Sequence, residues 1–326
     1  MRRRIAVALV ALVALVGCTG GERADGSRDR GAETSSTATS SGLAGSAGCG
    51  RMRPEVDARH LVRSTIESSG GSRHYMVYVP DTYDPAVPAP LAFVFHGAGS
   101  NKEEQLAYSG YAPYADEDGA LLVLPDALGS PARWSPLGAA FAGVEGVDDL
   151  RFFDDLTAEV TSTYCVDPGR VLVTGMSSGG YMSAVVGCTR SGEVAAVGPV
   201  TATVWAEPLC GEATPVAYAY FHGTDDPVVL YEGGGSRGTR PVIETSQDWA
   251  EQNGCDPDPV DERIGDDVIH RRWLGCDATT DLYTVEGGGH TWPGARDVGR
   301  LGHTTQAISA TQIIWDVFTA ASSPSS

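Results

Sequence analysis

Residues 170–189 constrain the fold more than any other stretch of this sequence. Residues 171–174 form a short β-branched run typical of a buried strand, and residues 178–189 are small and apolar enough for a helix. The turn between them reads Gly-Met-Ser-Ser-Gly, and its glycines keep side chains away from a crowded bend. Such a turn lifts the central serine hydroxyl clear of the sheet, in front of the free N–H groups of the helix. We interpret the segment as a nucleophile elbow centred on Ser177.

The Gly-x-Ser-x-Gly pattern by itself is weak evidence, because it occurs again at residues 234–238 in a chain with 41 glycines. That second match has no strand pattern before it and no apolar helix pattern after it, so we interpret it as a surface loop. The alternative interpretation is that Ser177 is only the N-cap of the helix that follows. Partner residues further along the chain favour the catalytic interpretation.

Strand and helix patterns alternate along the chain, which predicts an α/β fold with a mostly parallel central sheet and helices on both faces. We expect strands at 73–79 (an edge strand), 90–95, 120–124, 171–174, 193–200, 215–221, 268–274 and 281–285, and helices at 102–108, 147–164, 178–189, 241–253 and 304–320. Ligands bind such sheets beyond the carboxyl ends of the strands. Four polar or glycine-rich segments follow strands there, and they begin at His96, Ser177, His222 and Gly287.

A serine nucleophile needs a histidine base, and four histidines follow Ser177 in the chain. His222 ends a predicted strand and is better suited to ordering the next turn. His270 lies inside a strand pattern, and His303 opens the last predicted helix, where it could act as a cap. His290 lies in a glycine-rich loop after the final strand, from which it can reach the serine. We therefore predict His290 as the general base.

The remaining catalytic groups are a carboxylate and two backbone donors. Asp226 and Asp225 compete as the acid that orients the histidine, and we prefer Asp226 because the following proline fixes its backbone. The order serine, aspartate, histidine is that of the α/β-hydrolase fold. We expect the oxyanion to be bound by the backbone N–H of Ser178 and by that of Ala98, in the loop after the strand at 90–95.

Several stretches resemble one known family over residues 73 to 320. They are Phe95-His-Gly-Ala-Gly99, Tyr164-Cys-Val-Asp-Pro-Gly-Arg-Val171, Gly175-Met-Ser-Ser-Gly-Gly180, Phe221-His-Gly-Thr-Asp-Asp-Pro-Val228 and Gly288-Gly-His-Thr-Trp-Pro-Gly294. The family is that of bacterial polyhydroxybutyrate depolymerases and feruloyl esterases. The resemblance implies serine esterase activity with the same triad, Ser177, Asp226 and His290. Ala98 departs from the family pattern, which often has a cysteine or a glycine there.

A long segment without clear periodicity, residues 125–146, follows one of the predicted strands and is typical of a functional loop. We expect four aromatic side chains from loops at this end of the sheet to wall an acyl or phenolic group. They are Trp134, Trp205, Tyr231 and Trp292. Packing of the loop bases is the alternative explanation for any one of them.

The N-terminus has the pattern of a lipoprotein signal peptide over residues 1–17, with three arginines, a run of twelve apolar residues and small residues before Cys18. Cys18 is then the lipidated residue. Residues 18–48 contain that cysteine and a flexible linker rich in Gly, Ser and Thr, residues 49–320 are the catalytic domain, and residues 321–326 are a disordered tail. We expect an exported protein held at the cell membrane, outside the cytoplasm, by its lipid.

Six cysteines remain after Cys18, and an even number in an exported chain indicates disulfides. Fifteen pairings are possible. We favour Cys188–Cys210 and Cys255–Cys276 because each closes a short segment, which leaves Cys49–Cys165; the family resemblance also supports Cys255–Cys276. No Cys-x-x-Cys motif occurs, which disfavours zinc or redox chemistry.

These patterns predict a serine esterase that forms an acyl-enzyme on Ser177 and needs no cofactor or metal. The formal charge of −19 disfavours nucleic acid as a partner. We expect a monomer that acts on a small-molecule or oligomeric ester of the feruloyl, acetyl-polysaccharide or hydroxyalkanoate type and contacts the membrane only through its lipid. An acyltransferase with the same triad and a catalytically idle surface-binding lipoprotein are the alternatives.

Overall fold

One ten-stranded sheet forms the centre of the part of the chain that the computed structural model describes, residues 45–137, 146–202, 210, 213–235 and 238–321. Its strands are β1 (Leu61–Ser68), β2 (Gly71–Tyr78), β3 (Ala89–Phe95), β4 (Leu121–Pro125), β5 (Val166–Met176), β6 (Ala196–Val200), β7 (Ala217–Gly223), β8 (Val260–Ile264), β9 (Val268–Arg272) and β10 (Thr280–Val285). The helices are α1 (Lys102–Ser109), α2 (Ala112–Asp118), α3 (Asp149–Thr163), α4 (Ser178–Thr189), α5 (Val242–Gln252) and α6 (Ala310–Ala321), with a 3₁₀ turn, η2 (Gly299–Leu301).

The strand order is β1-β2-β4-β3-β5-β6-β7-β10-β9-β8. The six strands from β4 to β10 in this order run parallel, and antiparallel pairs flank them on both sides. The predicted α/β architecture with a mostly parallel sheet is therefore confirmed. The expected edge position of the strand at 73–79 is wrong, because β1 pairs with β2 along its whole length and takes the edge.

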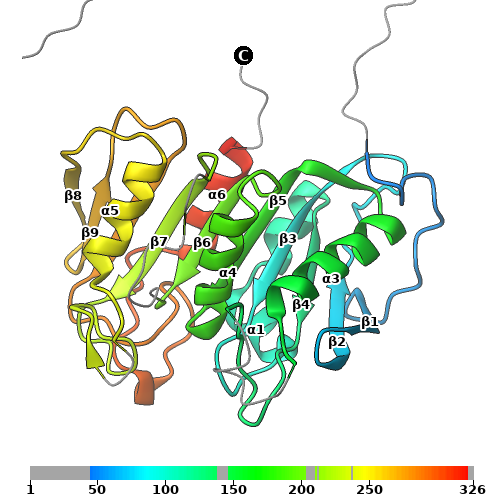
Figure 1. The fold of residues 1–326 in the computed structure, drawn as a ribbon, viewed down its shortest axis with the longest axis horizontal. Coiled ribbons are helices and arrows are strands. Elements are labelled where there is room, and N and C mark those ends of the chain that lie inside the picture. The colour runs from blue at the N-terminus through cyan, green and yellow to red at the C-terminus, as the bar shows by residue number, and fades with distance from the viewer. Residues whose placement is uncertain (1–44, 138–145, 203–209, 211–212, 236–237, 322–326) are drawn as a thin grey trace, which may run out of the picture. The chain divides into compact units, whose positions relative to one another are not determined.

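Helices cover both faces of the sheet because the buried strands are apolar on both sides. On one face, Phe93 and Val173 pack against α3, α4 and α5; on the other, Val94 and Leu172 pack against α1, α2 and α6. Figure 1 shows α3, α4 and α5 in front of the strands and α6 behind them. The loops that follow β7 and β10 lie together at the lower edge of the sheet in the same view, so the carboxyl ends of these strands share one rim.

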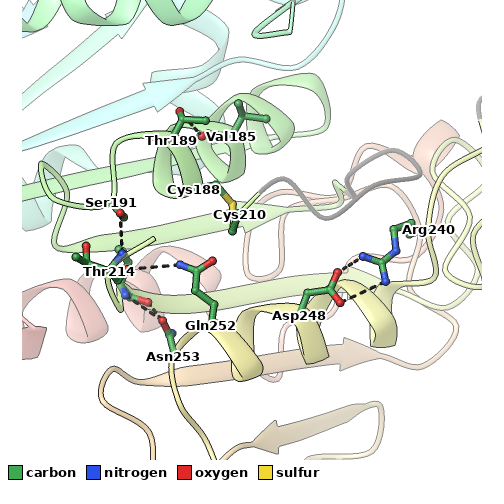
Figure 2. Close-up of a disulfide and its surroundings, with 11 residues drawn as sticks. Val185, Cys188, Thr189, Ser191, Cys210, Thr214, Arg240, Asp248, Gln252 and Asn253 are labelled. Atoms are coloured by element: carbon green, nitrogen blue, oxygen red, sulfur yellow. Dashed lines mark hydrogen bonds and ion pairs between the residues drawn. A yellow bond between two sulfur atoms is a disulfide. The ribbon is translucent and has the colours of Figure 1, made fainter. Parts of the chain in front are cut away.

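All three predicted disulfides are present, namely Cys49–Cys165, Cys188–Cys210 and Cys255–Cys276. Figure 2 shows the Cys188–Cys210 bond beside a hydrogen bond from the Thr214 N–H to the Ser191 hydroxyl. Together these contacts tie the end of α4 to the segment that leads into β7. Cross-links between sequence-distant segments restrict the unfolded chain and so favour the folded one.

The folded part begins before residue 49, where the linker was expected to end. The Ser46 N–H donates to the Val166 carbonyl at 2.9 Å, and the Ser46 hydroxyl donates to the Tyr164 carbonyl at 2.7 Å. Residues 46–48 therefore pack on the domain next to the Cys49 disulfide. The predicted signal peptide, Cys18 and most of the linker lie outside the described residues, as do residues 322–326 of the predicted tail. Among the helices that are described, none is both long and apolar enough to cross a membrane.

The first turn of α4 lies directly on the end of β3. A Cβ atom added at Gly179 would be 2.2 Å from the Phe95 carbonyl oxygen and 2.6 Å from that of His96. A Cβ at Gly175 would be 2.6 Å from the same Phe95 oxygen. Contacts this short exclude every residue except glycine, so the two glycines bring helix and strand together behind Ser177.

We expect Gly179→Ala to destabilise the protein by roughly 1–3 kcal/mol, because the added methyl forces β3 and α4 apart. This is opposite in sign to the usual effect of replacing a helical glycine with alanine. Gly192→Ala is the matched control, since a Cβ there would have no heavy atom within 4 Å. Guanidinium unfolding of both variants measures the difference, and equal midpoints would contradict the contact described above.

Candidate active site

Ser177 lies in the bend between β5 and α4 with φ 56° and ψ −118°. A positive φ is costly for any residue with a side chain, by about 1–3 kcal/mol, and such outliers concentrate at functional sites. The Ser177 N–H donates to the Val200 carbonyl at 2.9 Å, which anchors the bend to the neighbouring strand β6. The predicted elbow is therefore present, and Ser177 lines a surface cleft.

His290 and Asp226 meet at the end of the sheet although they are 64 residues apart in the chain. The distance from His290 Nδ1 to Asp226 Oδ2 is 2.7 Å, and Asp226 is buried. Because the carboxylate accepts the Nδ1 proton, Nε2 of the neutral ring is left free to act as a base. His290 lines the same cleft as Ser177, so the serine and the His290–Asp226 pair of the predicted triad border one cleft.

The Asp226 carboxylate is held by several donors. One oxygen accepts the N–H groups of Val228 and Val229 at 2.8 and 2.9 Å, while the other faces His290. Burial by itself raises the pKa of Asp226, but the hydrogen bond and the charge of His290, with the Val229 N–H, bring it below its ordinary value. Asp226 therefore remains a carboxylate at neutral pH. Asp225, the alternative, is exposed.

A second histidine, His222, lies near the carboxylate without a hydrogen bond to it. Its side chain is fully buried, and its Nε2 lies 3.9 Å from Asp226 Oδ2. Burial lowers the pKa of His222 to about 4, although the charge of Asp226 acts in the opposite direction. The ring is therefore neutral at neutral pH. It was predicted only to order the turn after β7.

The loop that carries the predicted oxyanion donor Ala98 is fixed by the buried ring of His96. His96 Nδ1 lies 2.7 Å from the Gly97 carbonyl, and its Nε2 lies 3.0 Å from the Ala127 N–H. A neutral ring protonated at Nδ1 satisfies both contacts, and burial lowers the pKa of His96 accordingly. Ala98 lines the cleft beside Ser177 and Ser178, so both predicted donors border the nucleophile.

The cleft has two sides that meet at Ser177, Ala98, His290 and Leu301. On one side the lining is largely apolar and includes Val228, Val229, Leu230 and Ala202, with Arg133 as the one cation among the described residues there. The other side carries polar and charged residues, namely Ser100, Glu104, Gln105, Arg296 and Arg300. A bound ester would therefore have chemically different surroundings on the two sides of its carbonyl.

The predicted aromatic wall is not where the sequence suggested. Trp134 and Trp292 are 0% and 1% exposed, and neither lines the cleft. Trp134 donates its indole N–H to the His96 carbonyl at 2.9 Å, so it anchors the oxyanion loop from inside the core. Tyr231 is half-buried, and its hydroxyl lies 2.8 Å from Thr284 Oγ1. Trp205 lies outside the described residues.

Two other histidines were assigned structural roles. His270 lies in β9 as expected and stacks on Tyr283, with ring centroids 4.2 Å apart. The expectation that His303 caps the last helix is wrong, because α6 begins only at Ala310. His303 Nε2 instead lies 2.8 Å from Asp267 Oδ2. Its backbone pairs with Gly288, which steadies the loop that carries His290.

Sequence reasoning missed the residues that line most of the cleft. Leu230 and Arg300 follow no motif, and only their position after a strand or next to a catalytic loop could have indicated them; Val228 ends a stretch that resembles the family but was given no role. Within the described ranges, no three His, Cys, Asp or Glu side chains are arranged to hold a metal ion.

Because His222 is neutral in the folded protein, we expect the free energy of unfolding to fall at acidic pH. Between pH 6.5 and about 4 the unfolded chain binds a proton at this residue and the folded chain does not. This contribution to stability is complete above pH 6.5 and falls by up to about 3 kcal/mol as the pH approaches 4. His222→Gln should flatten the decline, while His74→Gln, at an exposed position in β2, should not. Urea unfolding at several pH values measures both slopes, and identical curves for the three proteins would refute the assignment.

Comparison with known proteins places this geometry among esterases. No family model matches the chain. Feruloyl esterase D of Neurospora crassa is 31% identical over 268 residues, which cover 78% of this chain and 85% of that protein. Probable feruloyl esterase C of Aspergillus niger is 27% identical over 285 residues, which cover 85% of this chain and 92% of that protein.

A solved structure supports the same fold. An acetyl xylan esterase from Aspergillus awamori superposes with a TM-score of 0.57 at 18% identity, covering 71% of this chain and 94% of that one. At this identity the likeness shows the fold alone, which is that of the α/β-hydrolases. With the sequence relatives, it identifies the chain as a carboxylic ester hydrolase with the α/β-hydrolase fold that belongs to the feruloyl esterase family.

Proposed function

We propose that the protein hydrolyses carboxylic esters through an acyl-enzyme on Ser177. The observation that carries this proposal is the convergence of the strained Ser177 bend with the His290–Asp226 pair at one cleft. Both fit the needs of a nucleophile, its base and the group that orients the base.

The steps follow from these positions. Ser177 Oγ attacks the ester carbonyl carbon while His290 Nε2 takes the hydroxyl proton, and the N–H groups of Ala98 and Ser178 stabilise the oxyanion. Collapse of the tetrahedral intermediate breaks the bond to the alcohol, which leaves with the proton from His290. Water then adds to the acyl-serine, with His290 again as base, and the acid is released. Asp226 remains ionised and holds the imidazolium.

The apolar side of the cleft suits the acyl group. Val228 and Leu230 line this side and are 53% and 43% exposed, so they offer aliphatic surface to a ligand. A hydroxycinnamoyl ring of the kind implied by the relatives' names would cover them. The acid released would then be a feruloyl-type acid. The same side would also take other acyl groups. These are the acetyl groups of acetylated polysaccharide and the acyl groups of hydroxyalkanoates.

We further propose export and attachment to the membrane through Cys18. Three arginines, a twelve-residue apolar run and small residues before Cys18 support a lipoprotein signal. The three disulfides fit a chain that folds in an oxidising compartment.

Ser177→Ala should reduce kcat for 4-nitrophenyl acetate by roughly 10⁴- to 10⁶-fold and abolish labelling by a fluorophosphonate, because the nucleophile is lost. Ser236→Ala is the matched control at the second Gly-x-Ser-x-Gly sequence and should retain both. Residual turnover by Ser177→Ala equal to that of the native protein would mean that another residue is the nucleophile. Transfer of the acyl group to added alcohols in preference to water would favour the acyltransferase alternative.

Cys18→Ser should move the protein from the membrane fraction to the soluble fraction of cells that express the full chain, because the lipid acceptor is removed. Incorporation of labelled palmitate should disappear in the same variant. Cys49→Ser, which removes a disulfide but not the proposed acceptor, is the control and should remain labelled. Palmitate incorporation that survives Cys18→Ser would exclude Cys18 as the lipidated residue.

A further inference from the structure

Two arginines line the polar side of the catalytic cleft without a carboxylate partner. Arg296 and Arg300 are exposed, and neither has a carboxylate oxygen within 4.0 Å among the described residues. Arginines elsewhere in the domain are commonly paired, as Arg63 is with Asp57 and Arg190 with Asp154. Two unpaired guanidinium groups beside the nucleophile are therefore available to a ligand.

The position of two arginines in the cleft is more significant because the chain as a whole is strongly acidic. The chain carries a formal charge of −19, so an anionic ligand is repelled at long range by most of the surface. Among the residues that line the polar side, Arg296 and Arg300 accompany one carboxylate, Glu104, although the charge of the adjacent Asp297 opposes that of Arg296 at the lining residue Tyr108. Glu104 Oε2 accepts the Ser100 hydroxyl at 2.7 Å. The local charge of the lining is thus positive on a strongly acidic protein.

A buried side chain in the same lining supplies an independent sign of a ligand. Gln105 is 3% exposed, yet its amide Nε2 has no hydrogen-bond partner among the described residues. A buried donor without a partner is unfavourable. Gln105 lines the polar side of the cleft together with the arginines. The Gln105 side chain would have to turn for this amide to donate to a ligand oxygen in the cleft.

We infer that the polar side of the cleft binds an anionic group, a carboxylate on the alcohol portion of the ester. This inference rests on the proposed function and specifies its substrate class. If the acyl group occupies the apolar side, the alcohol extends toward Arg296, Arg300 and the Gln105 amide. Guanidinium groups and an amide donor are suited to carboxylate oxygens. An acidic sugar that bears the esterified hydroxyl is an alcohol of this kind.

The test compares 4-acetoxybenzoate with 4-acetoxybenzamide, which differ only in whether the leaving alcohol carries a carboxylate or a neutral amide. The measured quantity is the ratio of kcat/KM for the two esters. In Arg296→Gln/Arg300→Gln this ratio should fall by about 3- to 10-fold, as expected for two partly exposed ionic contacts. Raising the salt concentration should lower the ratio in the native protein and have less effect in the variant.

Arg59→Gln/Arg272→Gln is the matched control, because it removes two charges at exposed positions outside the cleft lining. Its ratio should stay within about twofold of the native one. An equal fall in the control would overturn the inference, since general repulsion would then explain the effect. So would an unchanged ratio in Arg296→Gln/Arg300→Gln, or a fall seen only in Arg133→Gln on the apolar side.

The outcomes also separate this inference from the proposed function. If Ser177→Ala still cleaves both esters, the acyl-enzyme proposal fails. If Ser177→Ala is inactive while the ratio is the same in native protein and Arg296→Gln/Arg300→Gln, the triad assignment holds and the anion subsite alone is wrong.

Discussion

The catalytic geometry depends on the contact between the first turn of α4 and the end of β3. With Gly179 against the Phe95 and His96 carbonyl oxygens, the backbone after Ser177 and the backbone after His96 are forced to run side by side. Those two backbones supply the proposed donors Ser178 and Ala98. A hydrogen-bonding site made of main-chain groups can be only as exact as the packing beneath it, and here the packing has no room for a methyl group.

Three histidines near this contact have different roles because their surroundings differ. His96 and His222 are buried, have lowered pKa values and serve as neutral rings, one holding the oxyanion loop and the other lying near the carboxylate. His290 has one nitrogen on Asp226 and an edge that borders the cleft. Residue type therefore identifies none of these roles. Burial and hydrogen-bond partners decide which histidine can exchange a proton with a substrate.

The sequence was sufficient where the signal was local. The elbow around Ser177 follows from a strand, a glycine-flanked turn and a helix, and the choice of Asp226 follows from the chain order serine, aspartate, histidine and a neighbouring proline. It failed where the outcome depended on packing between distant segments. Trp134 is in a long loop, as expected, yet its ring turns into the core to reach the His96 carbonyl. The edge strand β1 has only one buried residue among its eight and lacks the apolar signal of a buried strand.

Substrate specificity depends on the residues that line the cleft. Most of them are loop residues outside the sequence motifs, so the sequence alone does not identify them. The relatives and the triad identify the bond that is cleaved, but neither determines what lies on each side of it. Here the two sides differ in physical character: exposed aliphatic side chains at Val228 and Leu230 on one side, unpaired guanidinium groups at Arg296 and Arg300 on the other. If the proposed anion subsite exists, a substrate with negative charge at one end only would be oriented by these arginines before its ester reaches Ser177.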